Sequence, residues 1–111
     1  MQTSSCVRIV FTTESTPDAA ARLGRTLVEE GLAACATLLP AAQSIYRWQG
    51  VVECATETLL LLKTSSEHLH ALETRLHQLH SYQIPEFLAV DVDRCSDSYC
   101  DWLLAALRST N

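Results

Sequence analysis

The sequence predicts an α+β fold with the element order βαββαβα, and three observations support this prediction. Two segments alternate apolar and polar residues with the period of a strand, two more are apolar and favour strands, and apolar residues recur with helical spacing in three others. The 111 residues, 48% of them hydrophobic, suit one domain that spans residues 1–111. The element order is that of the ferredoxin-like split βαβ motif, an antiparallel sheet with helices on one face. We therefore expect this motif, extended by one long hairpin.

The first strand and the first helix are expected within residues 6–31. Residues 6–13 alternate in polarity, and the side chains expected on the buried face are Val7, Ile9 and Phe11. Thr16 is a favourable N-cap, and Pro17 suits the first helical position because its missing N–H has no partner there. Gly31 suits the left-handed residue that follows a helix. We therefore expect a helix that begins at Pro17 and stops at Gly31.

A long hairpin is expected between residues 32 and 64. Residues 32–48 favour a strand in which Pro40 indicates a bulge or bend, Gln49-Gly50 indicates a turn, and residues 51–64 return as a strand. The 17 residues of the first arm reach roughly 56 Å, whereas a globule of this length is about 35 Å across. The overhang carries large apolar side chains: Ile45, Tyr46, Trp48, Val51 and Val52. Such a surface is unfavourable in water, so we expect a homo-oligomer built by strand pairing.

The remaining elements follow from similar signals. Residues 66–80 predict an amphipathic helix capped by Ser65 or Ser66, with one apolar stripe of Leu69, Leu72, Leu76 and Leu79. Residues 82–85 indicate a loop and residues 87–92 a strand. A last helix is expected to begin within residues 96–98 and to carry Tyr99, Trp102, Leu103 and Leu107.

Charge and composition exclude several classes of protein. Thirteen acidic and eight basic residues give a formal net charge of −5, which argues against binding to nucleic acid because phosphate recognition needs clustered Lys and Arg. The longest apolar run, residues 102–107, is far shorter than the ~20 residues of a membrane span, and residues 1–5 lack the features of a signal peptide. The five cysteines have no paired spacing, so we expect reduced thiols and a cytoplasmic location.

Motifs typical of enzymes are missing from the sequence. It contains no nucleophile elbow, zinc-protease or phosphate-loop motif, and only three glycines. The segment at residues 12–16 offers neither Gly nor Arg for the anion cradle that an acylphosphatase of this fold class needs, and fold alone does not supply a function. We therefore expect a protein without catalytic residues and without an organic cofactor.

A first candidate site lies on the helix expected at residues 66–80. At 100° per residue, Glu73, His77 and His80 form one stripe, with His70 beside it. Imidazole and carboxylate groups spaced by three and four residues suit Cu(II) or Zn(II). The hypothesis is a divalent-metal site, weak or adventitious, formed by these residues. The alternative is a solvated helix face without a ligand.

A second candidate site combines Lys63, Tyr82 and Glu86 with Tyr46 and Trp48 of the hairpin. Lys63 ends a strand and Glu86 precedes another, so both are expected at one edge of the sheet. There the hairpin tip of a second subunit is expected to cover an apolar cleft with a few polar groups, a typical small-ligand pocket. The alternative is a structural ion pair with interface packing.

Five segments resemble the CutA family of divalent-cation tolerance proteins. They are residues 27–36 (LVEEGLAACA), 44–50 (SIYRWQG), 61–64 (LLKT), 80–86 (HSYQIPE) and 99–103 (YCDWL), in the order and spacing of the family. The resemblance implies a ferredoxin-like homotrimer in which the long hairpin embraces the neighbouring subunit. It also implies tolerance of divalent metals, and binding of them, with copper as an example.

The resemblance also marks departures at functional positions. Copper ligation described for a bacterial member uses a Cys at the end of the first strand, where this chain has Thr12, and two adjacent His, where it has Leu79 and His80. Only His80 keeps the ligand type of that site. The expected function is thus a non-enzymatic homotrimer that binds divalent metal ions. The alternative is a PII-like trimeric signalling module that binds a small metabolite in the inter-subunit cleft or a protein partner.

Overall fold

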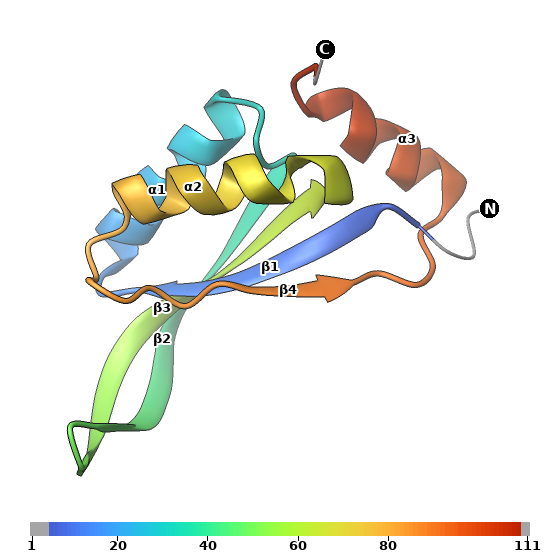
Figure 1. The fold of residues 1–111 in the computed structure, drawn as a ribbon. Coiled ribbons are helices and arrows are strands. Elements are labelled where there is room, and N and C mark those ends of the chain that lie inside the picture. Colours follow the sequence, from blue (N-terminus) through green and yellow to red (C-terminus); the bar gives the residue numbers. More distant parts are fainter. Residues whose placement is uncertain (1–4, 110–111) are drawn as a thin grey trace.

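The computed structural model describes residues 5–109 and has the predicted order of strands and helices (Figure 1). Residues 1–4, on which the expected lack of a leader partly rests, lie outside the described part. The strands are β1 (Val7–Glu14), β2 (Cys35–Trp48), β3 (Val51–Ser65) and β4 (Leu88–Asp91). The helices are α1 (Pro17–Glu29), α2 (Leu69–Leu79), preceded by a 3-10 turn (Ser66–His68), and α3 (Asp97–Ala106).

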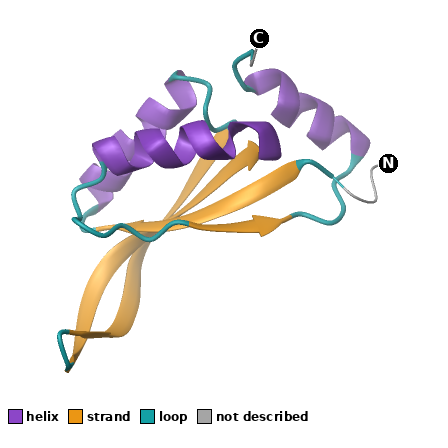
Figure 2. Ribbon diagram, in the orientation of Figure 1, coloured by secondary structure: helices purple, strands orange, loops and turns teal. Residues whose placement is uncertain are grey.

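The four strands form one antiparallel sheet in the order β2-β3-β1-β4. All three helices lie on the same side of this sheet, and the opposite side is bare of helices (Figure 2). The predicted ferredoxin-like α+β architecture is therefore confirmed. Within residues 5–109, no helix is long and apolar enough to span a membrane.

The side chains of β1 that face the helices are not those predicted from the alternation. Val10 and Thr12 are fully buried beneath the helices, whereas Ile9 and Phe11 lie on the open side and are only partly buried. Val7 is buried as predicted, but in a second cluster beside α3. Both faces of β1 carry apolar residues, so alternation alone did not identify the inner face.

The predicted signals at both ends of α1 are confirmed. Thr16 caps the helix, because its Oγ1 accepts a hydrogen bond of 3.1 Å from the backbone N–H of Ala19, and Pro17 begins the helix. Gly31 follows the helix with a φ of +72°, and a Cβ at this position would lie 2.8 Å from the backbone N of Arg108. Gly31 therefore allows both the left-handed turn and the close approach of the C-terminal segment.

The β2–β3 hairpin projects beyond the helix-covered sheet (Figure 1). The molecule extends 45 Å along its long axis but only 26 and 21 Å across it. The predicted irregularity at Pro40 is present as a bulge between Leu39 and Ala42, where Ala41 has a φ of 63°. The tip remains exposed: the fractional exposure is 74% for Ile45 and 58% for Val51.

The helix predicted at residues 66–80 differs from the observed one at its C-terminal end. The α-helix stops at Leu79, and His80 is the C-cap, with extended backbone angles of φ −70° and ψ 145°. Leu72 and Leu76 are fully buried in the main core, as the leucine stripe predicted. The change of backbone direction at His80 is decisive for the site, because it turns this side chain away from the helix face.

Candidate functional site

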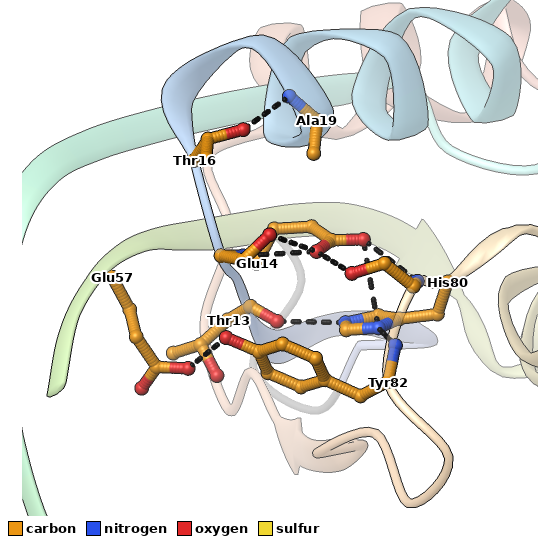
Figure 3. A network of polar contacts seen from close by, with 9 residues as sticks. Thr13, Glu14, Thr16, Ala19, Glu57, His80 and Tyr82 are labelled. Carbon is orange, nitrogen blue, oxygen red and sulfur yellow. Dashed lines mark hydrogen bonds and ion pairs between the residues drawn. The ribbon is translucent and has the colours of Figure 1, made fainter.

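Glu14, at the end of β1, is the centre of a buried polar network (Figure 3). Its Oε1 accepts hydrogen bonds from the Ser15 backbone N–H at 2.9 Å and from the Ser81 hydroxyl at 2.5 Å, and its Oε2 accepts one from the Ser81 N–H at 3.0 Å. Burial raises the pKa of Glu14, but these hydrogen bonds outweigh burial and hold the pKa below its ordinary value. Glu14 thereby fixes the segment that follows α2 to the end of β1.

His80 is part of the same network. Its Nε2 lies 2.7 Å from the carbonyl oxygen of Thr13, and its Nδ1 lies 3.0 Å from the backbone N of Tyr82 and 3.5 Å from Oε2 of Glu14. A backbone N–H can only donate, so Nδ1 accepts from Tyr82 and Nε2 carries the proton that is donated to Thr13. Both ring nitrogens of His80 are therefore occupied by backbone groups.

Tyr82 links this network to the root of the hairpin. Its ring packs against His80 with 4.8 Å between ring centres, and its hydroxyl donates a hydrogen bond of 2.5 Å to Oε2 of Glu57 (Figure 3). Burial first, and then the bond to Glu57 and its charge, raise the pKa of Tyr82. Burial and the charge of Glu57 also raise the pKa of Glu86. The Tyr82 hydroxyl is therefore a neutral donor at physiological pH.

A cleft of about 800 Å³ lies between the outer hairpin and the segment after α2. It brings together four of the five residues predicted for a ligand cleft, namely Tyr46, Trp48, Tyr82 and Glu86. Tyr46 lies directly opposite Glu53 across the hairpin, so the two share one face of the ribbon. Within one chain, the residues of its own hairpin line this cleft. The predicted cover by the hairpin of a second subunit stays a prediction.

Lys63, the fifth predicted residue, does not line this cleft. It lies opposite Cys35 in the β2–β3 ladder, and its Nζ donates a hydrogen bond of 3.0 Å to Oγ1 of Thr37. The strand separates it from Glu57 by six residues, about 20 Å. Accordingly, no ion pair between Lys63 and Glu86 forms in the described residues. The hypothesis that Lys63 and Glu86 meet at one edge is wrong.

The structure does not bring the three predicted metal ligands together. Glu73 and His77 are exposed on α2, where Nδ1 of His77 lies 2.8 Å from the Glu73 carbonyl oxygen. His80 is buried, because the chain leaves the helix one residue earlier and points this ring toward Thr13. Residues 5–109 hold no group of three or more His, Cys, Asp or Glu side chains arranged to bind a metal ion.

The positions at which the family resemblance implies copper ligation do not fit copper in this chain. Thr12 is fully buried, and its hydroxyl has no hydrogen-bond partner, but a neutral hydroxyl is a poor copper ligand compared with a thiolate. Leu79 offers no donor. His80 would have to give up a backbone hydrogen bond to free a nitrogen.

Sequence reasoning missed Glu14, Glu57 and Ser81. Glu14 precedes α1 in a polar segment, and nothing in the sequence indicates that a carboxylate there is 2% exposed. Glu57 occurs in an alternating strand, where an acidic residue usually faces solvent. The only available signal was indirect, since the prediction placed Tyr82 in a ligand cleft and Tyr82 contacts Glu57.

Comparisons with known proteins find relatives that match most of this chain. Residues 8–106 match the family model described as CutA1 divalent ion tolerance protein. The divalent-cation tolerance protein CutA of Pectobacterium atrosepticum is 42% identical over 104 residues, which cover 93% of this chain and 94% of that protein.

Solved structures of the same name share the fold. CutA of Xylella fastidiosa superposes with a TM-score of 0.91 at 42% identity, covering 94% of this chain and all of that chain. CutA1 of Oryza sativa superposes with a TM-score of 0.92 at 31% identity, covering 98% of this chain and all of that chain. The chain belongs to the CutA1 divalent ion tolerance protein family.

Proposed function

We propose that this chain acts in the tolerance of divalent cations as a non-enzymatic homotrimer. The observation that carries the proposal is the side of the sheet that no helix covers (Figure 2), on which apolar residues of three strands lie next to one another. Its residues are aligned by the strand register: Ile9 lies beside Val90, and Phe11 lies between Leu61 and Leu88. Leu88 and Val90 are 60% and 43% exposed, although both are apolar. A sheet face of this kind is typical of a protein interface.

The projecting hairpin supports the same assembly. Its apolar tip is exposed, and β2 and β4 are edge strands whose outer backbone groups have no strand partner in the described residues. Copies of the chain can cover both features at once, by packing their open faces together and by strand pairing at the edges. The number of three subunits comes from the resemblance to the CutA family.

The homotrimer is tested by sedimentation velocity with two matched variants. Val90→Glu places a charge on the open face, whereas Val28→Glu places it on an exposed site of α1, where Val28 is 37% exposed. We expect a trimer for the wild type and for Val28→Glu, and dissociation for Val90→Glu, because the interface would bury an unpaired charge. A monomeric wild type at micromolar concentration would contradict the proposal.

For the cation, we propose weak binding of Cu(II) or Zn(II) by Glu73 and His77. The two residues are one turn apart on the exposed face of α2, which is the spacing for a shared ion. The formal charge of −5 per chain raises the local concentration of cations. His70 is two turns from His77, about 10 Å along the helix, so it cannot share the same ion.

Titration calorimetry with Cu(II) tests the metal proposal. His77→Ala and Glu73→Ala are each expected to weaken binding, and His70→Ala, which removes an exposed imidazole of the same helix, is the control. If His70→Ala has as large an effect as His77→Ala, binding is a general property of surface imidazoles.

We also propose a cytoplasmic location, which the free state of all five cysteines, each within the described residues, supports.

The cleft favours a second candidate function, a trimeric signalling module of the PII-like kind. The specific observation is that four residues from separate parts of the chain line one cavity of about 800 Å³, a volume typical of small-molecule sites. A thermal-shift screen with nucleotides and small metabolites separates the two functions, since a ligand of the folded state raises the Tm.

A further inference from the structure

The cleft has a one-sided composition. The charged residues that one chain contributes to it are all acidic, namely Glu53, Glu57 and Glu86, and no Lys, Arg or His of residues 5–109 lines it. Its aromatic residues are Tyr46, Trp48 and Tyr82, and the isoleucines Ile45 and Ile84 add apolar surface. An anionic ligand would meet three carboxylates without a counter-charge. The lining therefore selects against anions and in favour of cations.

Glu57 is the carboxylate of the cleft that would contact a bound cation. It is only 9% exposed, and its Oε2 accepts the hydrogen bond from Tyr82. In the described residues, no other hydrogen bond or ion pair holds its second oxygen, and its charge helps to raise the pKa of Glu86. A carboxylate in such surroundings is stabilised by an opposite charge. A cation in the cleft would supply that charge.

The kind of cation follows from the size and the walls of the cleft. A bare metal ion fits poorly, because residues 5–109 hold no group of three ligating side chains. A volume of about 800 Å³ admits a molecule with a carbon skeleton. Ring faces such as that of Trp48 attract ammonium groups and also pack against apolar carbon. The site thus combines the two elements of organic-cation recognition.

We propose that this cleft binds an organic cation, with its ammonium group at Glu57 and its apolar body against Trp48 and Ile84. The proposal rests on the second candidate function and supplies its ligand class. It does not depend on the binding of divalent metal ions. Amines and quaternary ammonium compounds belong to this class; nucleotides, organic acids and sugars do not.

The test uses three probes that share one body, namely 2-phenylethylamine, 2-phenylethanol and 3-phenylpropanoate, on the full-length protein at pH 7. The amine is protonated there, since alkyl amines have a pKa of about 10. Binding is followed by the fluorescence of Trp48 in a Trp102→Phe background, which removes the other tryptophan. We expect saturable binding of the amine, at least tenfold weaker binding of the alcohol, and none of the carboxylate.

Two variants locate the binding. Glu57→Gln keeps the shape of the side chain and the acceptor for Tyr82 but removes the charge. It is expected to weaken binding of the amine at least tenfold. Glu86→Gln, measured in parallel, is expected to weaken binding of the amine less than Glu57→Gln does. If Glu57→Gln does not fold, the loss of affinity in Glu86→Gln tests the proposal in its place. Glu29→Gln on α1 makes the same change of net charge outside the cleft and is expected to leave the affinity unchanged.

Several results would overturn the proposal. Equal affinity for the amine and the alcohol would show that the cleft binds only the apolar body of the probe. If Glu29→Gln weakens binding of the amine as much as Glu57→Gln does, the net charge of the protein alone explains the binding. Absence of binding by the assembled wild type would show that the cleft does not accept an organic cation. Sedimentation of the same samples keeps the outcomes apart: a monomer that binds the amine refutes only the trimer, and a trimer that does not bind it refutes only the cleft.

Discussion

Glu14→Gln is expected to destabilise the protein, although the change keeps the shape of the side chain. The carboxylate accepts hydrogen bonds from the Ser15 N–H, the Ser81 N–H and the Ser81 hydroxyl. The amide of glutamine keeps one acceptor oxygen and places an NH₂ group against a donor. Hydrogen bonds to a charged group contribute about 1.5–3 kcal/mol, and a buried donor left unpaired costs about 1–3 kcal/mol. We expect a loss of about 2 kcal/mol in the free energy of unfolding, or roughly 10 °C in Tm.

Urea unfolding followed by circular dichroism measures this loss, at one fixed protomer concentration because assembly shifts apparent stability. The pKa of Glu14 is lowered by folding, so its contribution is present above the ordinary carboxyl pKa and disappears as the pH falls through the lowered pKa. The difference between wild type and Glu14→Gln is therefore expected at pH 7 and should vanish in acid. Glu29→Gln, an exposed change of the same kind, is the control. A difference below about 0.5 kcal/mol at pH 7, or one independent of pH, would refute the reasoning.

Three further substitutions test individual features by the same unfolding measurement. Gly31→Ala is expected to cost about 2–3 kcal/mol, because φ is +72° and the new Cβ meets Arg108, whereas Gly50→Ala, with a φ of +82° and open space, should cost only about 1 kcal/mol. Equal losses would contradict the role of the contact. Thr12→Val is expected to stabilise the protein by about 1 kcal/mol, since it removes a buried hydroxyl without a partner, and a loss would show that the hydroxyl is hydrogen-bonded. Thr16→Ala should cost about 1 kcal/mol and Ser96→Ala much less, because the Ser96 side chain makes no cap hydrogen bond.

Local signals predicted the order of the elements and several of their ends. A Thr-Pro pair began α1, Gly31 followed it, and Gln49-Gly50 turned the hairpin, because caps and left-handed residues act over a few neighbours. The main core was also predictable where one face of an element is polar, as in α2. It was not predictable for β1, because Ile9 and Val10 are both apolar and only tertiary packing decides which of them the helices cover.

The candidate sites failed where they depended on tertiary geometry. The metal stripe assumed that the helix continued through His80, but the hydrogen bonds of His80 to Thr13 and Tyr82 are made in an extended conformation. The cleft prediction found its aromatic residues and Glu86 but included Lys63, because position along a strand depends on register, which no single segment reveals. Glu14 and Glu57 were missed for the same reason.

The bulge near Pro40 also determines the chemistry of the outer hairpin. On the inner part of β2, Leu39 is paired with Leu59, and beyond the bulge Ala42 is paired with Glu57, so the alternation advances by one residue. Tyr46 therefore shares the ribbon face of Glu53. If β2 continued in its inner register without the bulge, Ile45 would lie opposite Glu53 and Arg47 opposite Val51, and a guanidinium would stand among the carboxylates. One extra residue thus leaves the hairpin intact but decides which of two alternating sets of side chains faces the cleft.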